Sequence, residues 1–362
     1  MIFTLIALSP LREELSMPRS RENFKRNTSS MKQKNIDKKL IVILGPTTSG
    51  KSKLAIKLAK NFNGEIVSAD SRQVYKEMDI GTGKISKKEM ENVPHHLIDI
   101  INPDQEFNVA IYKNLAIKKI KEVQKRGNLP FLVGGTGLYI QAIVDNMKFP
   151  KVLPDNELRK ELEQKSEKEL FKIYKKLDPE GAKVIDKKNK RRLIRAIEVC
   201  KVTKNPYSKQ RTKGKPLFDV LQIGVKLSKK ELEKNISKRV DKMFKLGLEK
   251  EVKTLAKKYT FNIPPMKTIG YQEWAPFFET KKGKNYSPTL SFKDKEKIKQ
   301  EIILHTLQFA KRQMTWFNHQ IDDFTAQNFS EKKFDEFKRD PRINWVKNKK
   351  EAEKLIRDFL NK

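Results

Sequence analysis

The segment from Gly45 to Ser52 reads Gly-Pro-Thr-Thr-Ser-Gly-Lys-Ser and fits the pattern G-x-x-x-x-G-K-[ST]. Glycines in such a loop allow backbone N–H groups to surround a phosphate, while Lys51 neutralises its charge and Ser52 is placed to ligate Mg²⁺. The same cradle suits a nucleoside triphosphate or a bare diphosphate, so the loop predicts a phosphate site without choosing a reaction. The predicted phosphate-binding residues are Gly45, Pro46, Thr47, Thr48, Ser49, Gly50, Lys51 and Ser52.

A second candidate group is the carboxylate of Asp70, within the segment Ser68-Ala69-Asp70-Ser71-Arg72-Gln73-Val74-Tyr75. This segment follows a predicted strand, and parallel sheets place their ligand crevice at such strand ends. A carboxylate in that position can accept a proton or hold a metal ion. The competing interpretation is a helix N-cap, because Asp and Ser are favoured there.

A third candidate is the glycine-rich segment Gly134-Gly135-Thr136-Gly137, which follows another predicted strand. Its glycines permit close approach of the backbone, and Thr136 can donate a hydrogen bond into the same crevice. A simple strand-to-helix turn is the alternative. Because three strand ends carry such segments, we expect them to converge on one site.

The elements that must position these groups are read from hydrophobic patterning. Leu40 to Leu44 is a continuous apolar run ended by Gly45-Pro46, which is typical of a strand covered on both faces. Further strands are predicted at 65–69, 129–133 and 219–227, and helices at 53–61 and 110–125. This alternation predicts an α/β fold, a P-loop NTPase-like parallel sheet with flanking helices.

Between residues 150 and 216 the strand pattern disappears and the sequence becomes helical and charged, with predicted helices at 157–175 and 191–202. We interpret 150–216 as an inserted all-helical domain. The core is then discontinuous, made of 40–149 and of 217–362, where C-terminal helices dominate. Residues 1–39 are expected to form a disordered leader, because the chain is polar from the end of a short apolar run at Ile2 to Leu8 onward.

The amino-acid composition indicates which kinds of binding partner are favoured. The chain has 79 Lys and Arg against 45 Asp and Glu, a net charge of +34 that attracts polyanions such as nucleic acid, although general surface enrichment in Lys gives the same excess. The single cysteine, Cys200, excludes an intramolecular disulfide framework and fits a reducing, cytoplasmic compartment. Cys200 is predicted to be a buried helix residue. No apolar run reaches about 18–20 residues, so no membrane partner is expected.

Taken jointly, the three segments above closely resemble the transfer-RNA dimethylallyltransferase family. Two further strings strengthen the likeness, Met78 to Lys84 and Pro94 to Asp99. The resemblance extends over about residues 40 to 318. Its later segments are Asp178-Pro179, Arg192 to Val199, Ile269-Gly270-Tyr271 and Lys311 to Phe317.

The resemblance implies transfer of a dimethylallyl group from dimethylallyl diphosphate to N6 of the adenosine 3′ of the anticodon, position 37, in transfer RNAs that read codons beginning with U. The base is flipped into a channel, which costs least for a loop nucleotide. In that family the aspartate matching Asp70 is the general base, and Thr47, Lys51 and Arg239 complete the catalytic set by holding the diphosphate. Mg²⁺ as cofactor, an anticodon stem-loop as partner and a monomeric enzyme are expected.

The resemblance also implies RNA contacts. Two positions depart from the family pattern: Arg191 replaces a glutamine and remains able to contact RNA, whereas Leu307 replaces an arginine and removes a peripheral charge. Trp274 and Trp316 are interpreted as core residues. The implied transfer-RNA contacts are Asp70, Ser71, Arg72, Gln73, Thr136, Arg159, Arg191, Arg192, Leu193, Ile194, Arg195, Lys267, Thr268, Ile269, Gly270, Tyr271 and Gln272.

Two alternatives remain at this stage. In a small-molecule kinase the loop binds ATP and Asp70 activates a hydroxyl, but the charge, the helical insertion and the long motif match argue against it. In an RNA-binding scaffold the site is degenerate, and the intact Lys51, Ser52 and Asp70 argue against that.

Overall fold

The structure is a computed structural model, and it describes residues 37–210, 212–278, 290–318 and 340–362. The leader predicted at 1–39 lies outside these residues except for its last three. One of those three, Lys39, already belongs to the first strand.

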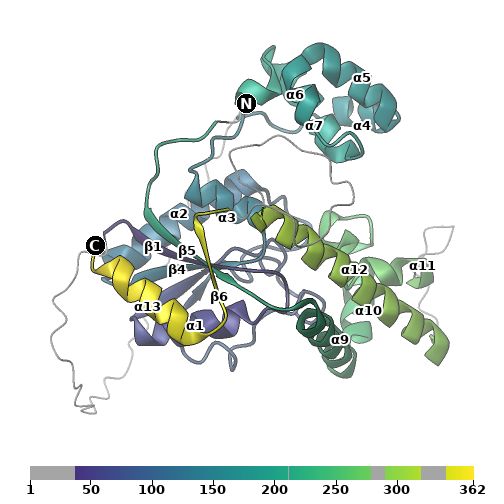
Figure 1. The fold of residues 1–362 in the computed structure, drawn as a ribbon. Helices are drawn as coiled ribbons and strands as arrows, with labels where there is room; N and C mark the ends of the chain where they lie inside the picture. The colour runs from purple at the N-terminus through teal and green to yellow at the C-terminus, as the bar shows by residue number, and fades with distance from the viewer. Residues whose placement is uncertain (1–36, 211, 279–289, 319–339) are drawn as a thin grey trace, which may run out of the picture. The chain divides into compact units, whose positions relative to one another are not determined.

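A six-stranded parallel sheet forms the centre of the core (Figure 1). Its order is β3-β2-β4-β1-β5-β6, so the first strand lies in the interior, paired with β4 and β5. The predicted parallel α/β fold with flanking helices is therefore confirmed. The strands are β1 (Lys39–Leu44), β2 (Gly64–Ser68), β3 (His95–His96), β4 (Leu129–Gly134), β5 (Asp219–Val225) and β6 (Ile343–Val346).

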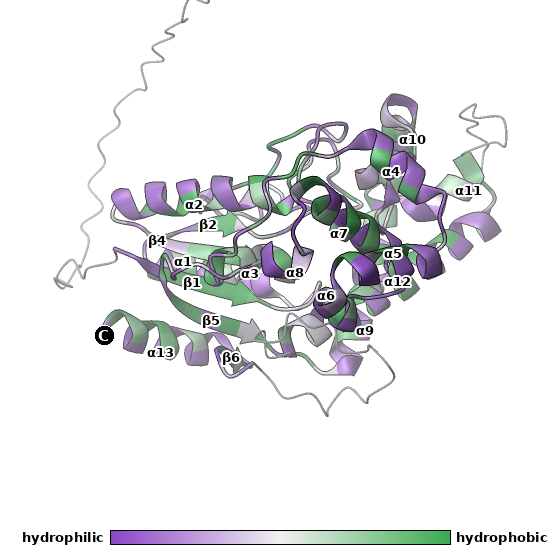
Figure 2. Cartoon of the chain, turned by 90° about the horizontal axis from the view of Figure 1, so that it is seen from above, coloured by the Kyte–Doolittle hydropathy of each residue, from purple (hydrophilic) through white to green (hydrophobic). Residues whose placement is uncertain are grey.

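Helices cover both faces of the sheet (Figure 1). Successive side chains of a strand point to opposite faces, and in β1 Ile41 and Ile43 pack with α1 (Lys51–Asn61) and α13 (Lys349–Leu360). Leu40 and Val42 pack with the opposite layer, which contains α2 (Val109–Lys125), α3 (Gly137–Val144) and the end of α12 (Phe292–Asn318). In Figure 2 the central strands β1 and β5 are mostly green, whereas the helices carry purple as well as green residues, as expected for elements with one solvated face.

Two predictions about elements need correction. The run at 157–175 was predicted as one helix, but it forms α4 (Asn156–Glu163) and α5 (Glu167–Leu177). The break occurs because Ser166 caps α5 in a capping box with Glu169. After β5, C-terminal helices were expected to dominate, and the short strand β6 that extends the sheet beside β5 was not predicted.

The insertion lies between α3 and β5 and consists of α4, α5, α6 (Pro179–Val184), α7 (Lys190–Thr203) and α8 (Tyr207–Gln210). It has its own apolar cluster, which includes Leu170, Leu193 and Cys200. Cys200 is thus buried in a helix, as predicted.

The incoming and outgoing chains of the insertion are bonded to each other. Lys148 donates its backbone N–H to the Thr212 carbonyl at 2.8 Å, and Gly214 donates to the Asn146 carbonyl at 3.2 Å. The Asn146 side chain also donates to the Lys215 carbonyl at 2.8 Å. The insertion therefore joins the core through one paired, antiparallel neck.

A last group of helices packs beside the loop that follows β2. Trp274 is fully buried in the shared apolar cluster, which also takes in Val74 and Met78, whereas Trp316 is only partly buried against the cluster of the sheet. Within the described ranges, no helix has the length and apolar character needed to cross a membrane. The group comprises α9 (Lys229–Lys245), α10 (Leu248–Tyr259), the 3₁₀ turns η1 (Pro264–Lys267) and η2 (Gln272–Trp274), α11 (Ala275–Phe278) and α12.

Candidate active site

A cavity of about 760 Å³ lies where the glycine-rich loop, the segment after β2 and the segment after β4 meet. These three segments follow the carboxyl ends of adjacent parallel strands, which is where such sheets place ligands. Arg239 of α9 and residues 267–270 close the cavity from the C-terminal helices. The convergence predicted from the sequence is therefore present.

The phosphate loop leads directly into α1, which begins at Lys51, two residues earlier than predicted. Gly50 stands before it in a left-handed conformation, φ 82°, and provides no side-chain cap, so the first N–H groups of the helix are open to an anion. The Lys51 ammonium donates to the Pro46 carbonyl at 3.1 Å. Among the described residues, the buried hydroxyl oxygens of Thr48 and Ser49 have no hydrogen-bond partner. The loop thus gathers hydrogen-bond donors at one end of the cavity.

Lys51, Arg239 and the Asp70 carboxylate interact electrostatically at the phosphate-loop end of the cavity. Burial lowers the pKa of Lys51 to about 8; the Asp70 carboxylate opposes this shift and Arg239 adds to it. The Arg239 guanidinium donates to Thr47 Oγ1 at 3.2 Å and to the Thr82 carbonyl at 2.8 Å. Burial also lowers the pKa of Arg239, but a guanidinium stays protonated in proteins. The cavity is therefore built to receive an anion.

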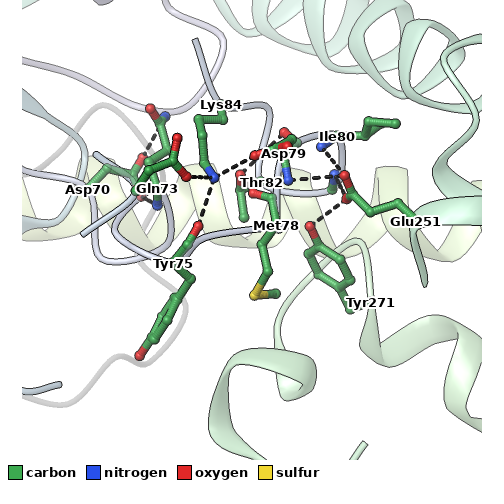
Figure 3. A network of polar contacts seen from close by, with 12 residues as sticks. Asp70, Gln73, Tyr75, Met78, Asp79, Ile80, Thr82, Lys84, Glu251 and Tyr271 are labelled. Atoms are coloured by element: carbon green, nitrogen blue, oxygen red, sulfur yellow. Dashed lines mark hydrogen bonds and ion pairs between the residues drawn. The ribbon is translucent and has the colours of Figure 1, made fainter. Parts of the chain in front are cut away.

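Asp70 serves two purposes in the structure. Its Oδ1 accepts from the backbone N–H of Arg72 at 2.9 Å and of Gln73 at 3.4 Å, so it does cap the following residues, which form a turn and not a helix. Its Oδ2 accepts from the Gln73 amide at 3.3 Å (Figure 3). The same carboxylate lines the cavity and remains half-buried. Capping and chemistry are compatible here.

The glycines after β4 do permit close approach, but the element that approaches is α12. A Cβ at Gly135 would lie 2.3 Å from the Gln313 amide, and one at Gly137 would lie 2.1 Å from the Trp316 ring. Thr136, between them, accepts from the Ser71 N–H at 3.1 Å and lines the cavity. The segment thus ties α12 and the loop after β2 to the end of β4.

Sequence reasoning missed Gln313 as a site residue. Its Oε1 accepts from the Thr47 N–H and its Nε2 donates to the Gly135 carbonyl, both at 2.8 Å. Gln313 is buried on the same helix face as Ala310 and Phe317, at the helical spacing i, i+3 and i+7. An amide on an otherwise apolar helix face is the sequence signal by which Gln313 could have been identified.

The implied RNA contacts divide into two sets. Arg159 and Arg195 bind the buried Glu198, with N···O distances from 2.5 to 2.8 Å. Leu193 and Ile194 are buried in the core of the insertion, Tyr271 is buried with its hydroxyl on Glu251, and Arg192 is exposed outside the cavity lining. Those that line the cavity are Asp70, Ser71, Arg72, Gln73, Thr136, Arg191, Lys267, Thr268, Ile269, Gly270 and Gln272.

Comparison with known families decides the relationship. The family model described as IPP transferase matches residues 73–320. The chain belongs to the IPP transferase family. The matched range begins after the phosphate loop and Asp70, so the place of those residues in the site rests on the geometry above.

Relatives agree with this assignment over most of the chain. The chain is 42% identical to the tRNA dimethylallyltransferase of Acetivibrio thermocellus over 286 residues, covering 77% of this chain and 88% of the relative. Its fold is similar to the full-length tRNA isopentenylpyrophosphate transferase of Bacillus halodurans, with a TM-score of 0.60 and 34% identity, covering 90% and 97% of the two chains. A eukaryotic dimethylallyltransferase acting on tRNA gives a TM-score of 0.65 at 27% identity, covering 77% and 70%.

Proposed function

We propose that this transferase moves a dimethylallyl group from dimethylallyl diphosphate to N6 of the adenosine 3′ of the anticodon, position 37, in transfer RNAs reading codons that begin with U. The products are N6-dimethylallyladenosine and diphosphate. One observation carries the proposal: a single cavity holds an anion site, made by Lys51, Arg239 and the start of α1, beside the carboxylate of Asp70. The names of its relatives, which are dimethylallyltransferases, support it.

The anion site would hold the donor's diphosphate. Lys51 and Arg239 stabilise the charge that grows on the leaving diphosphate as the bond from C1 to oxygen breaks. Thr47 orients Arg239 through their hydrogen bond and lines the cavity itself. The N–H groups of Gly50 to Ser52 at the start of α1 add donors aimed at the same anion.

Mg²⁺ fits this donor set. Ser52 offers a hard hydroxyl oxygen at the cavity wall. In the described part of the chain no group of three or more His, Cys, Asp or Glu side chains stands together as a metal site. Mg²⁺ typically binds through few protein ligands plus phosphate oxygens, so Ser52 would hold it against the diphosphate. When bound, the ion neutralises charge on the leaving group.

Asp70 would act on the acceptor. The lone pair of an adenine N6 is delocalised into the ring, so N6 is a weak nucleophile and benefits from a base within hydrogen-bond reach. As N6 bonds to C1, Asp70 takes the proton that N6 releases. The capping bonds from Arg72 and Gln73 fix the carboxylate for this transfer.

We propose residues 150–216 as the domain that binds transfer RNA in the cytoplasm, with the enzyme acting as a monomer. Asn189 and Arg191, at the start of α7, line the cavity, so the insertion reaches the place where a flipped base would enter. Arg159 and Arg195 can contact phosphate while bound to Glu198, because a guanidinium carries five N–H donors. The side chains of Leu193, Ile194 and Tyr271 are buried, so they would support the RNA-binding surface by packing beneath it.

The test is mass spectrometry of nucleosides from an unmodified anticodon stem-loop incubated with the protein, Mg²⁺ and dimethylallyl diphosphate. The expected product is N6-dimethylallyladenosine. Lys51→Ala is expected to abolish it, whereas Lys57→Ala, which changes an exposed lysine of the same helix, is expected to leave it unchanged. Absence of product with RNA still bound, together with ATP-dependent phosphorylation of a metabolite, would favour the kinase alternative.

A further inference from the structure

Glu251, on α10, holds the loop of residues 78–84 by three consecutive backbone N–H groups (Figure 3). Its Oε2 accepts from the N–H of Asp79 at 3.0 Å and of Ile80 at 2.7 Å, and its Oε1 accepts from the N–H of Gly81 at 2.9 Å. The Tyr271 hydroxyl also donates to Oε1, at 2.7 Å. Successive N–H groups of this kind form an anion-binding concavity, and here the anion is a side chain of the protein itself.

The loop that Glu251 holds is in direct contact with Arg239. The Thr82 carbonyl accepts from the Arg239 guanidinium at 2.8 Å. A Cβ at Gly83 would lie 2.1 Å from that guanidinium, so the arginine packs on bare backbone. The other terminal nitrogen of the same guanidinium, Nη1, donates to Thr47 Oγ1 of the phosphate loop. Glu251 is therefore connected to the anion site through the loop and Arg239.

A second anchor fixes the far side of the loop. The Lys84 side chain is 5% exposed, and it donates to the Tyr75 carbonyl at 2.7 Å, to Asp79 at 2.6 Å and to Asp99. Both anchors lie outside the cavity lining. Of the two, Glu251 holds the residues that lead directly into Thr82, whose carbonyl accepts from Arg239.

We propose that Glu251 is a positioning residue for diphosphate: by holding the N–H groups of Asp79, Ile80 and Gly81 it fixes the Thr82 carbonyl, and with it the guanidinium of Arg239. This inference rests on the proposed function, because it requires a diphosphate in the cavity. The carboxylate matters because both of its oxygens accept. A glutamine offers one acceptor oxygen and places an N–H₂ group against two donors.

The test compares binding of inorganic diphosphate with Mg²⁺, by titration calorimetry, in full-length variants. Glu251→Gln is expected to weaken diphosphate binding about tenfold, because hydrogen bonds to a charged group are lost, while affinity for the anticodon stem-loop is unchanged. Glu249→Gln, a substitution on the same helix that breaks only pairs with Lys253 and Lys295, is expected to leave diphosphate binding unchanged. In a double-mutant cycle, the variant that carries both Glu251→Gln and Arg239→Ala is expected to bind diphosphate no more weakly than Arg239→Ala alone.

Each other result has a defined meaning. Wild-type protein that binds no diphosphate would overturn the proposed function itself. Wild-type affinity in folded Glu251→Gln, additive losses in the cycle, or an equal loss of RNA affinity would overturn the positioning role. Should Glu251→Gln not fold, Gly83→Ala displaces the guanidinium without touching Glu251, and the same selective loss of diphosphate affinity is expected. Undiminished binding in that variant would overturn the role.

Discussion

Asp70 combines a capping role with a place in the cavity, and the two roles can be separated by one substitution. Asp70→Asn keeps an oxygen for the N–H groups of Arg72 and Gln73 but removes the basic carboxylate. We expect the variant to bind RNA and donor normally and to transfer the prenyl group about 10²–10⁴-fold more slowly, as measured in single-turnover assays. Asp104→Asn, at an exposed aspartate, serves as the control. Near-normal turnover in Asp70→Asn would remove Asp70 from the mechanism.

Lys51 gives the anion site a pH dependence. Burial lowers its pKa to about 8, and a bound diphosphate favours the charged ammonium. Below pH 8 the ammonium is present before binding, whereas above pH 8 binding must take up a proton. Diphosphate affinity is therefore expected to fall by about tenfold per pH unit above 8, until the pH reaches the pKa of the complex.

The measurement for Lys51 is calorimetry at several pH values in buffers of different ionisation enthalpy, which reports proton uptake directly. Lys51→Arg is the matched control because arginine keeps its charge throughout this range. The ligand's own titration is common to both proteins, so their difference isolates Lys51. Identical pH profiles would contradict the assignment.

At the scale of elements, α12 is fastened to the phosphate loop and to the end of β4 by one buried amide. Gln313→Ala would leave the Thr47 N–H and the Gly135 carbonyl without their partner, at a cost of about 1–3 kcal/mol in the free energy of unfolding. We expect weaker diphosphate binding as well, because the loop loses a tether. Gln308→Ala removes an exposed amide from the same helix and is expected to change neither quantity in denaturation and binding experiments.

The sequence predicted the elements whose signal is local. β1 and β4 are continuous apolar runs because both of their faces are buried, and the glycine pattern identified the loop between β1 and α1. β3 and β6 have two and four residues, too few for a periodic pattern. The break at Ser166 was missed although the Ser-x-x-Glu signal is present, since the charge-rich helical pattern runs through it.

The same reasoning applies to the site. The residues at strand ends were predictable because parallel topology brings those ends together. Gln313 and Glu251 were not, because their partners lie 266 and about 170 residues away in the chain and nothing local specifies those contacts. Burial of Leu193 and Ile194 also depended on how α7 packs against its neighbours.

At the scale of the whole molecule, the net charge of +34 predicts strong salt dependence for RNA binding. If six or more phosphates are neutralised, affinity for an anticodon stem-loop is expected to fall about 10³-fold between 50 and 200 mM salt, as measured by fluorescence anisotropy. Binding of inorganic diphosphate in the half-buried cavity should be less sensitive, because buried charges are screened less. A flat salt profile for the stem-loop would show that the surface charge does not contribute to recognition.

The paired neck at Asn146, Lys148, Thr212 and Gly214 has a consequence for how the inserted segment can be changed. A segment whose two ends lie side by side can be excised, shortened or exchanged for another without rethreading the strands around it, because a tight turn can bridge the gap. In this chain the neck brings the segment that leaves α3 back beside the segment that leads into β5. We therefore expect the insertion to tolerate shortening or exchange at this neck wherever its residues do not line the cavity, which chimeric proteins would test.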